Sequence, residues 1–291
     1  SHHSNQLLNK ILLVELILVK KGKIVTLKTD KNRRDSQVKA WDAAASNEVF
    51  FQPTSWEEDP FLQQIQREVH LTPEMKVLDI GCGGGRYALA LAERVGYVVG
   101  IDVSPKMIEN AREWAKKKGV TNVEYRVGDF PLMKREDIPG SFDLIFAHMT
   151  PAVMDMEDFA LLRSFAKGEG TSFYIVKPLK RKGHVDETVL ACLGREIKEE
   201  KFDVLTEKMF CRLWEEGLMP SIVHRKDRWT SEKTVEESME WVFERLKAYQ
   251  NIEEEKRESV RGYLEDMAQE GLIKEEVDVT ITTLGWKEEG R

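Results

Sequence analysis

A glycine-rich turn constrains this chain more than any other feature of its sequence. The apolar run Val77-Leu78-Asp79-Ile80 leads through Gly81, Gly83 and Gly85 into a segment rich in alanine and leucine. Glycine is needed where a chain leaves a strand with positive φ, and where a ligand must approach the backbone without meeting a Cβ atom. The run therefore predicts a strand, a tight turn and a helix that together hold a nucleoside.

A second acid follows a second apolar run, and the two acids narrow the class of ligand. Tyr97 to Asp102 reads as a buried strand ending in a carboxylate, which places Asp79 and Asp102 at neighbouring strand ends. Residues 83–88 fit the loose G-x-G-x-x-A form of a dinucleotide site, but such a site must cradle an anionic pyrophosphate. A carboxylate two residues before the first glycine repels pyrophosphate and suits the sulfonium and ammonium groups of S-adenosylmethionine.

On these residues the chain resembles the class I S-adenosylmethionine-dependent methyltransferases of the small-molecule type. The first motif of that family, acid-x-Gly-x-Gly-x-Gly, is matched by Asp79 and the three glycines that follow it. In the family the second acid binds the ribose hydroxyls, and the resemblance gives this role to Asp102. An acid after the third strand holds the adenine, and the resemblance gives this role to Asp129, which stands beside Phe130. The resemblance implies S-adenosyl-L-methionine as cofactor and a cofactor site made of Asp79, Gly81, Cys82, Gly83, Gly85, Asp102, Val103, Met107, Asp129, Phe130 and Ala147.

Asp102 and Asp129 have an alternative role, in which each caps the helix that follows it. For Asp102 a competing cap stands close by, because Ser104-Pro105 is a good helix start and Gly119 a good helix end. This competing cap leaves Asp102 available for a ligand.

Alternating strands and helices predict an α/β fold. Apolar runs at 142–147 and 171–177 continue the series begun at 77–80 and 97–102, a helix is expected over 203–216, and two last strands over 221–224 and 277–284. This alternation, with the resemblance, implies a Rossmann-like sheet of about seven mostly parallel strands with helices on both faces.

The core is expected to carry appendages. Residues 5–30 form an apolar arm, hairpin or helix, and 31–70 a helical segment that in such methyltransferases acts as a lid. The cofactor-binding core spans 71–229 with an insertion at 180–201, a helical cap covers 230–272, and 273–287 form the last strand. In the cap, Thr234 and Glu237 form a capping box, and stripes such as Val260 and Leu264 predict packing faces.

Composition limits the location and the partners. The formal net charge of −7 and the low pI argue against broad nucleic-acid or membrane binding. The three cysteines lack metal-ligand spacing and predict neither a disulfide framework nor a metal site. The apolar run 7–19 is too short to span a membrane and contains Glu15. A cytoplasmic enzyme is expected. Its apolar arm is expected to pack on its own domain or on a second subunit, which would make a homodimer.

His148 is the candidate catalytic residue. It follows the fourth predicted strand, at the mouth of the expected methyl site, and could accept a proton from the methyl acceptor. Its alternative role is an edge contact to the cofactor or the backbone.

The acceptor is expected to be a small molecule and to be anionic. Basic residues follow strands five and six, among them Lys177, Arg225 and Arg228, and could bind a carboxylate or phosphate; ordinary surface charge is the alternative. An RNA or protein methyltransferase, or a non-catalytic or NAD-type nucleotide-binding protein, are the competing functions.

Overall fold

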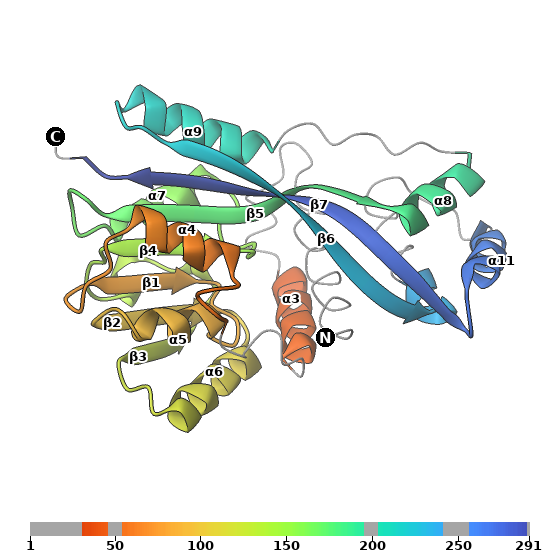
Figure 1. Ribbon diagram of the computed structural model, residues 1–291, viewed down its shortest axis with the longest axis horizontal. Helices are drawn as coiled ribbons and strands as arrows, with labels where there is room; N and C mark the ends of the chain where they lie inside the picture. Colours follow the sequence, from red (N-terminus) through yellow and green to blue (C-terminus); the bar gives the residue numbers. More distant parts are fainter. Residues whose placement is uncertain (1–30, 46–53, 195–202, 241–255, 290–291) are drawn as a thin grey trace. The chain divides into compact units, whose positions relative to one another are not determined.

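The computed structural model of the chain describes residues 31–45, 54–194, 203–240 and 256–289 (Figure 1). These residues belong to two compact units. The larger unit contains the described parts of Lys23–Lys177, Asp203–Val223 and Thr282–Arg291, and the smaller unit those of Pro178–Phe202 and His224–Ile281. The expected arm over 5–30 lies outside the described residues.

One seven-stranded sheet has the order β3-β2-β1-β4-β5-β7-β6. Its first five strands are parallel to their neighbours, whereas β7 runs in the opposite direction (Figure 1). The strands are β1 (Lys76–Ile80), β2 (Tyr97–Asp102), β3 (Val123–Val127), β4 (Leu144–His148), β5 (Ser172–Gly183), β6 (Ser221–Thr234) and β7 (Leu272–Lys287). The expected α/β class with a mostly parallel sheet is confirmed.

Helices cover both faces of the parallel strands, which explains why the strands β1, β2 and β4 are buried along nearly all of their length. In Figure 1, α4, α5 and α6 lie on one face of the sheet and α7 lies on the other face. The helix α9 contacts α7. The helices of the larger unit are α3 (Lys31–Ala44), α4 (Pro60–Glu68), α5 (Arg86–Ala92), α6 (Pro105–Lys118), α7 (Met156–Ser164) and α9 (Val204–Glu215), with short 3-10 turns η2 (Phe130–Leu132) and η3 (Arg135–Asp137).

The helix ends follow from local capping chemistry. The Ser104 hydroxyl accepts a hydrogen bond from the Met107 amide, Pro105 is the first residue of α6, and Gly119 ends it with φ 69°. Asp203 caps α9 in the same way. Both helices lie where the sequence predicted them.

The smaller unit has its own apolar core. It contains the outer parts of β5, β6 and β7 with α8 (His184–Cys192), residues 235–240 in helical conformation and α11 (Arg257–Met267). Val189, Met239, Val260 and Leu264 pack in its core, as packing faces should. The capping box of Thr234 and Glu237 is also present.

The ends expected for β5 and β6 were wrong. The segment 180–201 is not wholly an insertion, because β5 continues to Gly183. β6 runs on to Thr234, so the boundary expected between 229 and 230 lies inside a strand. β7 spans Leu272–Lys287, close to the residues 273–287 given to the last strand and longer than the apolar run 277–284. The outer residues of β6 and β7 alternate more buried with more exposed positions, and their many charged side chains conceal this period of two.

Candidate cofactor and catalytic site

The turn after β1 has a conformation that only glycine adopts readily. Gly81, Gly83 and Gly85 have φ values of 71°, 53° and 80°. Space is also limited, because a Cβ atom on Gly81 would lie 2.0 Å from Oγ1 of Thr150, and one on Gly85 would lie 2.5 Å from the Tyr125 hydroxyl oxygen. The backbone of the turn therefore lies close to Thr150, two residues after β4, and to the phenol of Tyr125 on β3.

Asp79 is a buried carboxylate with an unsatisfied oxygen. It is 1% exposed, and its Oδ2 atom has no hydrogen-bond partner among the described residues. Burial, and then the neighbouring charge of Asp102, raise the pKa of Asp79 well above its usual value. A cation bound at this carboxylate would offset the unfavourable burial of its charge.

Asp102 connects the end of β2 to the glycine turn. Its Oδ2 atom accepts a hydrogen bond of 2.9 Å from the Gly83 amide, and its Oδ1 atom accepts one of 2.9 Å from the Ser104 amide. Burial raises the pKa of Asp102 to about 6. Because the Ser104 hydroxyl already caps α6, Asp102 is not that helix's cap, as the sequence indicated.

The other expected cofactor residues lie in this part of the larger unit, with different exposures. Cys82, Met107, Phe130 and Ala147 are buried, whereas Val103 and Asp129 are half-buried. The Phe130 ring packs in the hydrophobic core with Phe165, at a centroid distance of 6.3 Å. Asp129 precedes η2, and its side chain makes no capping hydrogen bond there.

Cys82 fills space beneath the turn. Its Sγ atom lies 2.9 Å from where a Cβ atom of Gly100 would be, and it donates to the Gly83 carbonyl at 3.5 Å. Burial, followed by the charges of Asp79 and Asp102, raises the pKa of this thiol. It therefore stays protonated and packs as a small apolar group.

His148 ends β4 within an aromatic cluster that the sequence did not reveal. Its ring centroid lies 4.4 Å from that of Tyr87 and 4.7 Å from that of Phe61. The Tyr87 hydroxyl oxygen is 3.4 Å from Nε2 of His148 and donates a hydrogen bond of 3.0 Å to Oδ2 of Asp59. The sequence contained only a weak signal for these partners: Asp59-Pro60 as a helix start, and Tyr87 directly after the turn.

The residue after His148 has an unusual backbone. Met149 is not glycine, yet its φ is 52°, and its amide donates to the Val176 carbonyl at 2.7 Å. Such conformations are uncommon and concentrate at functional sites. This bend brings Thr150 against Gly81.

The basic residues expected to bind the acceptor are paired with acids. Lys177 forms an ion pair with Asp203 in the larger unit. In the smaller unit Arg228 lies 2.9 Å from Asp278 and 3.3 Å from Glu276. Arg225 similarly lies 3.1 Å from Asp227. The expectation that Arg225 and Arg228 follow strand six was wrong, since both lie within β6.

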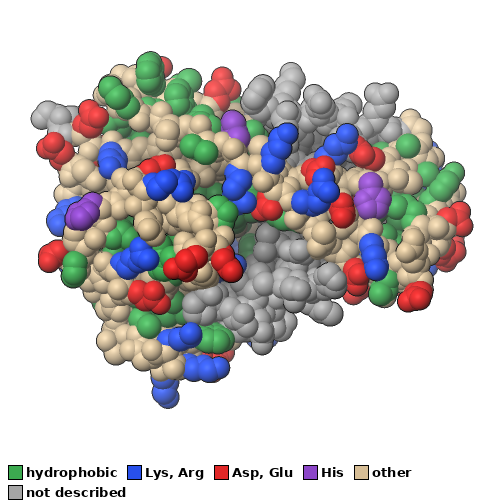
Figure 2. Space-filling view, in the orientation of Figure 1, with side chains coloured by type: hydrophobic (Ala, Val, Ile, Leu, Met, Phe, Trp, Pro, Cys, Tyr) green, Lys and Arg blue, Asp and Glu red, His purple; other side chains and the backbone are tan. Residues whose placement is uncertain are grey.

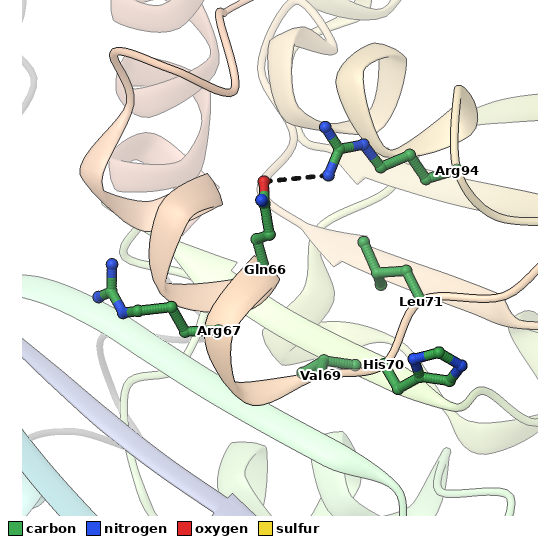
Figure 3. Close-up of a pocket in the computed structure, with 6 residues that line it drawn as sticks. All are labelled: Gln66, Arg67, Val69, His70, Leu71 and Arg94. Atoms are coloured by element: carbon green, nitrogen blue, oxygen red, sulfur yellow. Dashed lines mark hydrogen bonds between the residues drawn. The ribbon is translucent and has the colours of Figure 1, made fainter.

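A separate cavity of about 310 Å³ lies at the other end of the parallel strands. It is lined by the last turn of α4, by the segment that leads to β1 and by Arg94 after α5. Gln66 accepts a hydrogen bond of 3.0 Å from Arg94 there (Figure 3). Its lining residues are Gln66, Arg67, Val69, His70, Leu71 and Arg94. Because the glycine turn leaves the carboxyl end of β1, this cavity is not part of the candidate site.

The described residues contain neither a membrane-spanning helix nor a metal cluster. No described helix is long and apolar enough to cross a membrane. No group of three or more His, Cys, Asp or Glu side chains in the described ranges is arranged to hold a metal ion.

Comparison with known proteins identifies the segment that carries the site. Residues 71–182 match a family model described as a methyltransferase domain. An uncharacterized RNA methyltransferase of Halalkalibacterium halodurans is 40% identical over 83 residues, which cover 28% of this chain and 18% of that protein. The aklanonic acid methyltransferase DauC of a Streptomyces species is 42% identical over 79 residues, which cover 24% of this chain and 36% of that protein. The match thus spans only a small part of these relatives.

Solved structures of low sequence identity also resemble the chain. The YcgJ protein of Bacillus subtilis has a TM-score of 0.47 at 20% identity, over 78% of this chain and 98% of that one. A methyltransferase from Thiobacillus denitrificans, solved with S-adenosyl-L-homocysteine, has a TM-score of 0.44 at 17% identity, over 84% of this chain and 95% of that one. These scores are too low to support an argument, so the assignment depends on the sequence match and the motif within it. Residues 71–182, which include the glycine turn, Asp79 and Asp102, are thus similar to a methyltransferase domain.

Proposed function

We propose that the protein transfers a methyl group from S-adenosyl-L-methionine to a small-molecule acceptor. The observation that carries the proposal is the buried Asp79 carboxylate, whose Oδ2 atom has no partner among the described residues and which lies at a glycine turn beside a second buried acid. Two adjacent buried carboxylates favour a cationic ligand. A pyrophosphate, which an NAD-type site must bind, would add negative charge at the same place.

The residues present fit this cofactor. Asp79 would accept a hydrogen bond from the ammonium group of the methionine part, and the glycines would let that part approach the backbone. Asp102 would bind the ribose, and Asp129 with the backbone of Phe130 would hold the adenine, since the Phe130 ring is occupied in the core. Cys82, Val103, Met107 and Ala147 would complete the walls.

The chain's own contribution to the chemistry is alignment and proton removal. The bound cofactor supplies an activated methyl group, because its sulfonium is a good leaving group. The protein has to hold the acceptor in line with that methyl group and exclude water. His148 would accept the proton that the acceptor loses.

A small molecule is the acceptor that composition favours. The chain is acidic, with a formal net charge of −7. On the face shown in Figure 2, acidic and basic side chains are interspersed and form no continuous basic patch.

An RNA acceptor is the second candidate, because the Halalkalibacterium halodurans relative is named as an RNA methyltransferase. An anionic acceptor stays a prediction: the anion would have to displace the acids that now pair with Lys177, Arg225 and Arg228.

We also infer a cytoplasmic location. All three cysteines are free thiols, and Cys211 is exposed. Such thiols suit a reducing compartment. A homodimer formed through the arm over 5–30 stays a prediction.

A transfer assay tests the proposal. The protein is incubated with methyl-labelled S-adenosylmethionine and, in separate reactions, with a metabolite extract, total RNA or a protein extract. Label in a small product that depends on the protein supports the proposal. Label in RNA or protein alone would replace the small-molecule acceptor by the competing one, and no transfer to any pool would contradict methyltransferase activity.

A further inference from the structure

The hydroxyl of Tyr87 lies between a carboxylate and an imidazole, and this position limits where the protons can be. Asp59 Oδ1 accepts hydrogen bonds from the amides of Phe61 and Leu62, at 2.9 and 3.0 Å, and so caps α4. Asp59 Oδ2 accepts from the Thr54 hydroxyl at 3.1 Å and from Tyr87 at 3.0 Å. The guanidinium of Arg86 lies 3.8 Å from the same oxygen.

Every described partner of Asp59 is a donor, so this carboxylate acts only as an acceptor, as its ionised form does. Tyr87 has one hydroxyl proton, and it points to Asp59. Burial, followed by the charge of Asp59, raises the pKa of Tyr87, so the phenol keeps that proton. The phenol oxygen can then interact with His148 only by accepting a hydrogen bond.

We infer that Tyr87 is a positioning residue, held by Asp59, which fixes His148 in the tautomer that carries its proton on Nε2 and its lone pair on Nδ1. Nε2 is the nitrogen that lies 3.4 Å from the phenol oxygen, so it must be the donor of that pair. The nearby ring of Phe61 restricts the imidazole orientation. Asp59 thus determines the tautomer of His148 through the hydroxyl of Tyr87.

The consequence for catalysis rests on the proposed function. If His148 accepts a proton from the acceptor, Nδ1 is the accepting atom, and the Asp59–Tyr87 pair stabilises the imidazolium that forms. Tyr87 contacts the base rather than the reacting atoms, and its role is to orient the base. The tautomer itself is a property of the protein alone and can be measured without cofactor or acceptor.

Two substitutions give opposite expectations. In Asp59→Asn, the amide oxygen keeps the two α4 amides, so the NH₂ group takes the place of Oδ2 and donates to Tyr87. The phenol proton then turns to Nε2 of His148, and the proton of His148 moves to Nδ1. In Tyr87→Phe the hydroxyl is lost, and the preference for either tautomer should fall by about tenfold.

The experiment is long-range ¹H–¹⁵N correlation spectroscopy of the full chain labelled with ¹⁵N-histidine, at a pH where imidazole is neutral. The His148 signals are assigned by their loss in His148→Gln. Tyr97→Phe is the matched control, because its hydroxyl donates to Glu124 at 2.8 Å and not to the histidine.

The inference requires the Nε2–H form in the unsubstituted protein and in Tyr97→Phe, and the Nδ1–H form in Asp59→Asn. The Nδ1–H form in the unsubstituted protein would overturn it, as would an unchanged tautomer in both Asp59→Asn and Tyr87→Phe. Absence of cofactor binding, measured separately by calorimetry, would refute the proposed function and leave the tautomer result intact.

Discussion

At the scale of single residues, the site is defined by charges that burial makes unfavourable. Asp79 and Asp102 both have raised pKa values because burial removes them from water. Each contributes a free-energy cost to the protein without ligand, and a cationic ligand would relieve part of it. Polar groups buried in this way are typical of sites that have evolved for binding rather than for stability.

Stability should therefore depend on the ionisation of Asp102. Its pKa is about 6 in the folded protein and about 3.9 when unfolded. Between these values the folded state holds more protons, so the free energy of unfolding falls as pH rises from about 4 to 6, by on the order of 2 kcal/mol. Asp102→Asn should remove this part of the fall and leave the part that the raised pKa of Asp79 causes. Urea unfolding of both proteins across that range tests it, and equal pH slopes for the two proteins would show that Asp102 is not the cause.

The base role of His148 predicts a selective loss of turnover. His148→Gln removes the proton acceptor, so kcat should fall by about 10²-fold with any acceptor that the transfer assay identifies. Cofactor affinity should not change, because the imidazole is not among the groups proposed to bind it. His70→Gln, at an exposed position, is the control. Normal turnover in His148→Gln would contradict the base role and favour the alternative, in which the histidine only contacts the edge of the cofactor or the backbone.

At the scale of elements, the glycine turn is held between β1 and the segment after β4. Gly81 therefore has two reasons to be glycine: its φ of 71° and the side chain of Thr150. Gly119 has a similar φ of 69°, but no described atom lies within 4 Å of a Cβ there. Comparing substitutions at Gly81 and Gly119 therefore separates the cost of backbone strain from the cost of steric overlap.

Gly119→Ala should cost about 1 kcal/mol of unfolding free energy, from the left-handed conformation alone. Gly81→Ala should cost about 1–3 kcal/mol more, because its Cβ would overlap Thr150. Replacing that neighbour in the double variant Gly81→Ala, Thr150→Gly should recover most of the difference. Denaturant titration of the three proteins measures it. Equal costs for the two single variants would show that Thr150 does not restrict the turn.

At the scale of the whole molecule, the central parallel strands and the glycine turn were predictable from the sequence. The strands and helices of the smaller unit were only partly predictable. Strands β1 and β2 are buried along nearly all of their length and stand out as apolar runs. The outer halves of β6 and β7 alternate buried with exposed residues, and some buried positions are charged, such as Lys233 and Glu275, which lie 3.4 Å apart. A pattern of charges cannot reveal that two of them meet in a core.

The partners of His148 were hidden for a different reason. Asp59, Tyr87 and His148 come from the cap of α4, the first turn of α5 and the end of β4, and only tertiary packing brings them together. Sequence spacing identified the histidine from its strand but contained no information on what it contacts. The same limit applies to Arg225 and Arg228, whose acidic partners lie on their own strand and on β7.

The central claim is that the buried Asp79 carboxylate binds a cationic nucleoside cofactor, and calorimetric titration with S-adenosylhomocysteine tests it most directly. The protein should bind this ligand and should not bind NAD. Asp79→Asn should weaken binding by about 1.5–3 kcal/mol, about ten- to a hundredfold, which is the usual cost of losing a hydrogen bond to a charged group. Glu113→Gln, an equal change of charge at an exposed position of α6, should bind as the unsubstituted protein does. Binding of NAD in preference to S-adenosylhomocysteine, or full affinity in a folded Asp79→Asn variant, would contradict this claim.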